Sequence, residues 1–255
     1  MATEYTGTGD PARSLALLWR TSDKPGRKTK GRSGLSVEAI VRAAIEVADA
    51  DGLAALSMRR VAEHLGVGTM SLYTHIPGKA ELLDVMLDTV IGESERPEVI
   101  EGGWRAALEF IARERWSLYH RHPWLLHVAT SRPPLGPNVT AAYEYELRAV
   151  DGIGLTDLEM DSVVTLIGGY VHGTARGSVE AAQAAQHTGM TDEQWWHAHA
   201  PYLAAIMDGS RYPLAARVGS ASGQEHNAAY APAHAFEFGL QRILDGIEAL
   251  IRSRA

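Results

Sequence analysis

The segment of residues 57–75 constrains the fold of this chain more than any other part of the sequence. Ser57 is a good N-cap, and the residues after it have the apolar spacing of a short helix. Gly66 then supplies the backbone freedom that a helix end needs. A second short helix is expected near residues 69–76, with Leu72 facing inward. The spacing therefore predicts two short helices joined by a tight turn.

The open face of the second helix would present hydroxyl groups, an aromatic ring and an imidazole. Such side chains can reach base edges and phosphates in a DNA major groove without burying charge. The same pattern also fits a plain helical hairpin whose polar face is only solvated. The flanks favour the first interpretation, because an amphipathic helix is expected over residues 36–50 and another helix begins at Lys79. Together they predict a helix-turn-helix head followed by a connecting helix.

Six short segments of this head match the pattern of one protein family. They are Ile40-Val41-Arg42-Ala43-Ala44, Asp51-Gly52, residues 56–62, Leu65-Gly66-Val67, residues 71–75 and residues 78–83. Through them, residues 36–91 resemble the DNA-binding domain of the TetR family of bacterial transcription regulators. Residues 236–251 resemble the last helix of the branch that includes the tetracycline repressor. The resemblance implies an all-α fold, with a three-helix helix-turn-helix DNA-binding domain before a larger helical ligand-binding and dimerisation domain.

The chain is accordingly divided into three parts. Residues 1–34 are expected to form a flexible N-terminal extension with a basic arm, residues 35–91 the helix-turn-helix domain with its connecting helix, and residues 92–255 the ligand-binding and dimerisation domain. Proline and glycine punctuation separates the candidate helices of this last part. These are 103–120, 123–130, 137–151, 156–186, 191–208 and 233–252. Residues 209–232, rich in Gly, Ser and Ala, resemble a loop or a mobile cover.

The net charge of −7 is unexpected for a DNA-binding protein until it is divided along the chain. Residues 24–32 hold five basic residues and no acid, so the arm is strongly positive. A local basic patch matters more for phosphate binding than the total charge does. The arm is either a solvated tail or a flexible segment that adds phosphate or minor-groove contacts.

Side chains of the head and the arm are expected to contact double-stranded DNA. The resemblance implies that Ser57 donates its hydroxyl to a phosphate and that Arg59 enters the groove, where it could pair with a guanine. Tyr73 and Lys79 are expected at phosphates. The full set of DNA-binding candidates is Ser57, Arg59, Thr69, Met70, Ser71, Tyr73, Thr74, His75, Lys79, Lys28, Lys30 and Arg32.

Aromatic residues and histidines are concentrated between the head and the C-terminus. Such a set is typical of a cavity for a flat organic effector, although any single member could be ordinary core. The expected pocket residues are Trp104, Phe110, Trp116, His120, Trp124, Tyr143, Tyr170, His172, Trp195 and Tyr202. No spacing of histidines and carboxylates resembles a metal-ligand pattern, so neither a metal nor a cofactor is expected.

Two helices are candidates for the contact surface of a homodimer. Gly169 and Gly173 lie one turn apart within residues 156–186, and glycine inside a helix indicates close approach of another backbone or a ligand. The helix of residues 233–252 has a wide apolar stripe that includes Phe236, Leu240, Leu244 and Ile247. The alternative is a core helix of a monomer. The family resemblance implies a four-helix bundle, with two helices from each protomer.

The chain has no cysteine, which removes disulfides and thiolate chemistry and fits a reducing cytoplasm. Neither a signal peptide nor an apolar run long enough to cross a membrane is expected. The resemblance implies a cytoplasmic, nucleoid-associated repressor that leaves a palindromic operator when a small hydrophobic or aromatic molecule binds. An activator would use the same parts.

Two other classes of function remain open at this point. One is a weakly specific architectural DNA-binding protein, and the other is an enzyme or carrier with a vestigial helix-turn-helix. The sequence shows no nucleophile elbow and no phosphate-binding loop. The identity of the effector, the operator sequence and the regulated genes do not follow from these residues.

Overall fold

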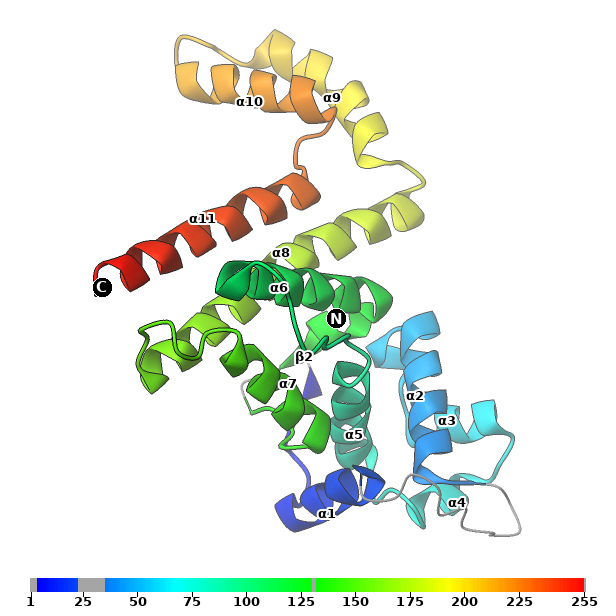
Figure 1. Cartoon of the computed structure of the whole chain (residues 1–255). Coiled ribbons are helices and arrows are strands. Elements are labelled where there is room, and N and C mark those ends of the chain that lie inside the picture. Colours follow the sequence, from blue (N-terminus) through cyan, green and yellow to red (C-terminus); the bar gives the residue numbers. More distant parts are fainter. Residues whose placement is uncertain (1–3, 23–34, 130–131, 255) are drawn as a thin grey trace.

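A computed structural model describes residues 4–22, 35–129 and 132–254, and Figure 1 shows that helices dominate them. The expected all-α class is confirmed. The α-helices of the described residues are α1 Pro11–Ser22, α2 Val37–Asp51, α3 Met58–Leu65, α4 Thr69–Tyr73, α5 Lys79–Ile91, α6 Gly103–Arg121, α7 Pro137–Arg148, α8 Asp157–Thr188, α9 Asp192–Ile206, α10 Pro213–His226 and α11 Pro232–Arg252. Short 3₁₀ helices span Leu53–Ala55 and Pro123–His127, and the two-residue strands are β1 Glu4–Tyr5 and β2 Val128–Ala129.

Helices α2, α3 and α4 form the head around a core of aliphatic side chains. The hydroxyl Oγ of Ser57 accepts the backbone N–H of Arg60 at 3.1 Å, so Ser57 is the N-cap of α3 as expected. Gly66 ends α3 in the left-handed conformation, with a φ of 67°, which is a position that favours glycine. The side chains of Leu72 and Ile76 are fully buried, so the inward face expected for the second short helix is confirmed.

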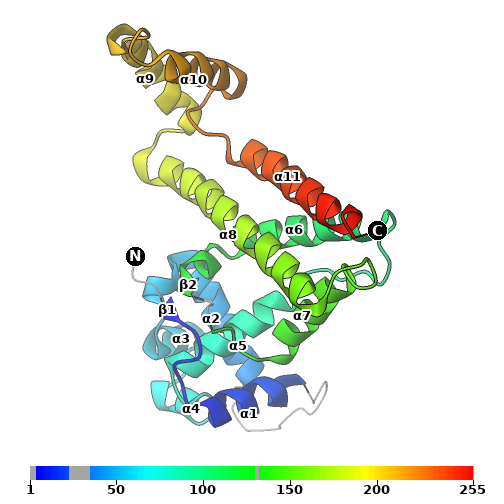
Figure 2. The same cartoon turned by 90° about the vertical axis from the view of Figure 1, so that its left-hand side faces the viewer.

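Helix α5 connects the head to the rest of the chain and is buried on almost every side. It packs against α2 in the head, against α1 at the N-terminus and against α7 in the body (Figures 1 and 2). Three of its buried residues are acidic: Glu81, Asp84 and Asp88. Asp88 accepts the backbone N–H groups of Asn138 at 3.0 Å and Val139 at 2.9 Å, at the start of α7.

The core of the body lies where α6 and α11 pack against the long helix α8. Tyr170 of α8 donates its phenolic O–H toward the carbonyls of Ala235 and Phe236 on α11, at 2.7 and 2.8 Å. Gly239 is needed for this approach, because a Cβ there would lie 2.2 Å from the Tyr170 oxygen. Four buried side chains of α11 complete the contact, namely Phe236, Leu240, Leu244 and Ile247.

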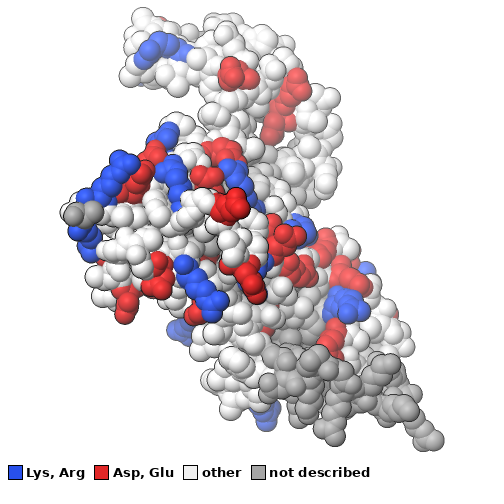
Figure 3. All heavy atoms as spheres, viewed as in Figure 1, with Lys and Arg blue, Asp and Glu red and all other residues white. Residues whose placement is uncertain are grey.

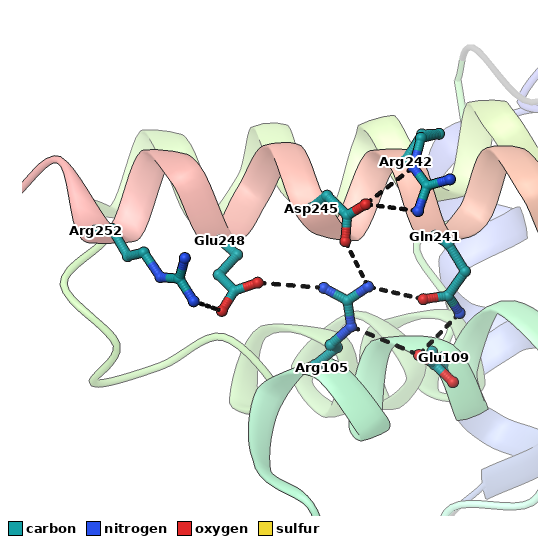
Figure 4. Close-up of polar contacts among 7 residues, drawn as sticks. All are labelled: Arg105, Glu109, Gln241, Arg242, Asp245, Glu248 and Arg252. Atoms are coloured by element: carbon teal, nitrogen blue, oxygen red, sulfur yellow. Dashed lines mark hydrogen bonds and ion pairs between the residues drawn. The ribbon is translucent and has the colours of Figure 1, made fainter.

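Polar contacts extend the junction of α6 and α11 to the surface (Figure 4). The guanidinium of Arg105 on α6 donates to Gln241 at 2.7 Å and to Asp245 at 2.8 Å, and it lies 3.5 Å from Glu248. Glu109, one turn along α6, accepts from the amide of Gln241 at 3.1 Å. One arginine thus links three successive turns of α11, which fixes how the two helices are aligned.

Helices α9 and α10 form a hairpin that extends beyond the body (Figures 1 and 2). None of the side chains of α9 is buried within the described chain. The expectation of a loop over residues 209–232 is wrong, because residues 213–226 are helical. The glycines of this segment suggested a loop, but Gly223 instead makes room for the Trp196 indole, which a Cβ would approach to 2.3 Å.

The expectation of a flexible extension over residues 1–34 is wrong for residues 4–22. Strand β1 pairs in parallel with β2, and α1 packs against α5 and α7. The helix expected over residues 123–130 is wrong for its described part, because Pro123–His127 form a 3₁₀ helix and Val128–Ala129 form β2. The basic arm lies outside the described residues, and so do the DNA-binding candidates Lys28, Lys30 and Arg32.

Two glycines inside α11 allow a direct test of this packing. Gly239→Ala is expected to destabilise the fold by about 1–3 kcal/mol, because the new methyl group displaces the hydrogen-bonded Tyr170 ring. Gly246→Ala is expected to stabilise it by about 0.5–1 kcal/mol, since nothing lies within 4 Å of its Cβ position and alanine favours a helix. Urea unfolding of both variants measures the difference. Equal effects of the two substitutions would contradict the packing described.

Candidate DNA-binding head and effector cavity

The α3–turn–α4 unit presents a short helix whose two faces differ sharply. Leu72 fixes α4 to the head core, and its side chain is fully buried. Met70 and Tyr73 point away from the core, with 76% and 44% of their surface exposed. In Figure 1, α4 lies at the end of the molecule opposite to the α9–α10 hairpin. Among the described residues, the outward face of α4 is therefore turned to solvent, where it could enter a DNA groove.

The remaining head candidates lie within α4 or on either side of it in the chain. Ser57 and Arg59 lie at the start of α3, and Lys79 is the first residue of α5. Arg59 is highly exposed and pairs with Glu63 one turn later, its Nε 2.8 Å from the carboxylate. Thr69 and His75 are partly buried, whereas Ser71 and Thr74 are exposed. Thr74 donates its hydroxyl to the carbonyl of Ser71 at 2.7 Å.

Contacts around the head include ion pairs that the sequence did not reveal. Lys79 lies 2.7 Å from Glu4, which precedes it by 75 residues, and Arg60 lies 2.8 Å from Asp51. No local spacing could indicate the first of these pairs. In Figure 3, basic and acidic side chains lie beside one another over the middle of the molecule. A net negative body of this kind does not offer DNA a uniformly basic face.

A cavity of about 730 Å³ lies in the body, beside the end of α5. Its walls come from the end of α5, from residues 94–96, from β2, and from α6, α7 and α8. Most of the lining is apolar, which suits an organic molecule of moderate size. The apolar walls include Leu87, Ile91, Ile111, Leu118, Leu125, Val128, Val139 and Val164, and the polar groups include Arg96, Arg115, Tyr119, Tyr143, Tyr145, Glu146 and His172.

The polar groups of this cavity are fixed by contacts with one another. Arg115 forms an ion pair with the buried carboxylate of Glu146, and Gly168 leaves the space that the guanidinium occupies. Burial lowers the pKa of His172, with a smaller effect from Arg176, so the imidazole is neutral at pH 7 and can donate or accept. Burial also raises the pKa of Tyr119, whose phenol stays protonated and can donate.

The structure brings together only some of the residues expected to form a pocket. Tyr143 and His172 line the cavity, and Trp104 lines a second one of about 780 Å³ between α6, α7 and the 96–103 segment. The other seven lie outside the walls of both: Phe110, Trp116, His120, Trp124, Tyr170, Trp195 and Tyr202. Arg115, Tyr119 and Tyr145 also line the cavity and were not predicted from the sequence, although Arg115 and Tyr119 share one helical face by their spacing of four residues.

Each of these seven side chains has another place in the fold. Trp116 and Tyr170 pack against Phe236 of α11, with ring centroids 4.3 and 6.2 Å apart. Trp124 is buried beside the head and donates its indole N–H to Asp49 at 2.9 Å. His120 lies 2.9 Å from the hydroxyl of Ser178. Phe110 is partly buried on α6, and α9 holds Trp195 and Tyr202 in the hairpin.

The structure divides the residues expected at a dimer contact into two groups. Phe236, Leu240, Leu244 and Ile247 are buried inside the chain against α6 and α8, so these side chains are not on the surface that a second protomer could contact. Gly169 and Gly173 on α8 remain open, with nothing within 4 Å of their Cβ positions. Gly169 also lines the cavity of about 730 Å³.

The described residues hold no group of three or more histidines, aspartates or glutamates placed to bind a metal ion. None of the helices in the described part of the chain is long and apolar enough to cross a membrane.

Comparison with known families assigns both parts of the chain. Residues 30–86 match the model of bacterial regulatory proteins of the tetR family, and residues 96–251 match the tetracyclin repressor-like C-terminal domain. This chain belongs to the TetR family. It is therefore a helix-turn-helix transcription regulator by class, and this class is not enzymatic.

Individual TetR-family relatives support the assignment along the whole chain. The HTH-type transcriptional repressor DrrR1 of Streptomyces coeruleorubidus is 48% identical, over 99% of this chain and 91% of that protein. The crystal structure of ActR from Streptomyces coelicolor in complex with actinorhodin has a TM-score of 0.71 at 29% identity, covering 84% of this chain and 96% of that one. The tetracycline repressor of class C from Escherichia coli is 34% identical over 29% of this chain and 35% of its own length.

Two residues of α4 separate folding from DNA contact in this TetR-family head. Leu72→Ala is expected to destabilise the head by about 2–5 kcal/mol, because it leaves a cavity under α4. Met70→Ala is expected to change stability by less than about 0.5 kcal/mol, since its side chain contacts solvent. Thermal unfolding measures both changes in stability. DNA binding by the folded Met70→Ala protein then measures what the Met70 side chain contributes to DNA contact. Equal stability losses would contradict the orientation of α4.

Proposed function

We propose that this chain is a ligand-responsive repressor that binds a palindromic operator as a homodimer. A small, largely apolar aromatic molecule releases it by filling the cavity of about 730 Å³. The observation that carries the proposal is the position of α5. Its first residue, Lys79, belongs to the head, and its last turns contribute Leu87 and Ile91 to the cavity wall. One rigid helix therefore reports the state of the cavity to the DNA-binding side chains.

The mechanism is a shift between two arrangements of the dimer. An effector can favour one arrangement only if it binds that arrangement more tightly. A molecule lodged between α5, α7 and α8 pushes on the end of α5, and the two heads then no longer match the spacing of the half-sites. The polar groups Arg115, Glu146 and His172 would select the effector by its hydrogen-bonding groups, and the apolar walls would supply most of the affinity.

The relatives support an organic effector and repression. ActR was crystallised with actinorhodin, and it shares this fold at 29% identity. DrrR1 is named a transcriptional repressor. We infer repression and an organic effector for this chain from these two proteins and from the lining of its own cavity. Because an operator-binding regulator acts where the chromosome lies, we place it in the cytoplasm at the nucleoid.

The proposed dimer uses the outer faces of α8 and α11. Leu166 on α8 is 50% exposed, and Gly169 and Gly173 continue the same face with open space above them. Phe238 on α11 is 58% exposed and points away from the core formed by its neighbours Phe236 and Leu240. Two copies related by a two-fold axis would bury these surfaces against each other and place two heads on one face of the DNA.

The first test is binding to the DNA upstream of the gene for this chain, compared with a shuffled duplex of the same composition. We expect tight binding to the first duplex alone, at two salt concentrations, with two chains per duplex by sedimentation. Arg59→Ala should weaken this binding about ten- to a hundredfold. Arg148→Ala is the matched control, because Arg148 forms the same kind of exposed pair with Glu144 on α7. Equal affinity for both duplexes would favour a weakly specific architectural protein.

The second test blocks the cavity. Ala142→Trp puts an indole into the cavity wall on α7, so it should remove release by actinorhodin while operator binding stays within about twofold. Ala182→Trp, at an exposed position of α8 away from the cavity, is the control and should respond like the unmodified protein. Fluorescence anisotropy of the operator complex measures both. Release that is unchanged by Ala142→Trp would place the effector elsewhere.

A further inference from the structure

Residues 4–22, named here the N-terminal strap, are attached to the wall of the cavity. Strand β1 pairs with β2, whose residues Val128 and Ala129 line the cavity. Thr6 strengthens the attachment, because its hydroxyl lies 2.7 Å from the carbonyl of Arg132 and 3.1 Å from that of Ala129. Thr6 is itself buried. The strap is thus bonded to the chain on both sides of residues 130–131.

The same strap is fixed along α5. The backbone N–H of Gly7 donates to the buried carboxylate of Asp84 at 3.0 Å. Helix α1 packs against α5, and Trp19 of α1 donates its indole N–H to the carbonyl of Leu135, just before α7. Movement of the cavity wall at β2 or before α7 therefore changes the position of the strap relative to α5.

At its beginning the strap reaches a side chain of the DNA-binding head. The carboxylate of Glu4 lies 2.7 Å from the ammonium of Lys79, and each side chain is about one-third exposed. A lysine held by a carboxylate cannot at the same time neutralise a DNA phosphate at full strength, because the carboxylate also repels that phosphate. Glu4 and a phosphate are therefore competitors for Lys79.

We infer that the N-terminal strap is an intramolecular competitor of DNA, which holds Lys79 through Glu4 while it is docked on the cavity wall through β1. This inference rests on the proposed function, in which Lys79 contacts the operator backbone. DNA binding loosens the strap, and by reciprocity whatever tightens the β1–β2 contact weakens DNA binding. An effector that packs against Val128 and Ala129 acts in this direction, so the strap adds a second route from cavity to head beside α5.

The DNA end of the strap is tested with Glu4→Gln, which removes the charge and keeps the size. Affinity for a duplex should rise about two- to fivefold, the range that exposed ion pairs allow, with a steeper salt dependence. The gain should vanish in a Lys79→Gln background, as a double-mutant cycle shows. Glu38→Gln, at an exposed acid of α2, is the control for the general effect of charge. Because phosphate contact is independent of sequence, operator and shuffled duplexes should show the same gain.

The cavity end is tested with Thr6→Val. This substitution removes the hydroxyl that contacts the carbonyls of Ala129 and Arg132, and it leaves Glu4 and Lys79 intact. DNA affinity should again rise, and Glu4→Gln should add little to it. Hydrogen exchange of the peptide covering residues 4–9 should speed up when DNA binds, because the Gly7 N–H leaves Asp84.

The outcomes separate the strap from the repressor function. An unchanged affinity of Glu4→Gln, or the same gain in the Lys79→Gln background, would overturn the competition. An unchanged affinity of Thr6→Val would overturn the link to the cavity wall. If the unmodified protein binds no duplex, the proposed function fails and the strap inference fails with it. Binding by the unmodified protein with no effect of either strap variant would overturn the inference alone.

Discussion

The buried acidic side of α5 is the constraint on which the arrangement of head, strap and body depends. Asp84 and Asp88 accept backbone N–H groups from the strap and from the start of α7, respectively. Burial raises the pKa of both carboxyl groups, against the opposing effect of these hydrogen bonds. Moving either partner away would leave a carboxylate in an apolar environment without its donors, which is unfavourable. The position of α5 relative to α7 and the strap is therefore defined within narrow limits.

This rigidity has a consequence for the transmission of a signal. A helix that slid freely past its neighbours could not convert the filling of a cavity into a movement of the head. Because Asp88 is bonded to α7, a displacement of α7 by a molecule beside Val139 and Ala142 moves α5 as well. Because Asp84 is bonded to Gly7, the strap follows α5. In the proposed mechanism, the two routes from the cavity to Lys79 are therefore coupled through α5.

The head could be predicted from the sequence because its determinants are local. Ser57, Gly66 and the spacing up to Leu72 specify caps, turn and buried face within sixteen residues of one another. The body depends on contacts that are distant in sequence. There the sequence predicted where the helices lie better than which elements pack against one another. An apolar helix such as α11 buries one face, but nothing local says whether a second chain or α8 covers it. The β1–β2 pairing joins residues 123 positions apart or more, and no periodicity indicates it.

The same reasoning explains why the pocket was predicted less well than the head. Trp116, Tyr119 and His120 all lie on α6 within five residues, yet only Tyr119 faces the cavity, while Trp116 packs on Phe236. A helix turns by about 100° per residue, so aromatic side chains that are close in sequence are directed to different partners. The deciding residues are small ones: Gly168 admits Arg115 to the cavity wall, and Gly239 brings α11 against Tyr170. Where α8 meets its neighbours, glycines rather than aromatics set which side chains pack there, and Gly168 sets which one lines the cavity.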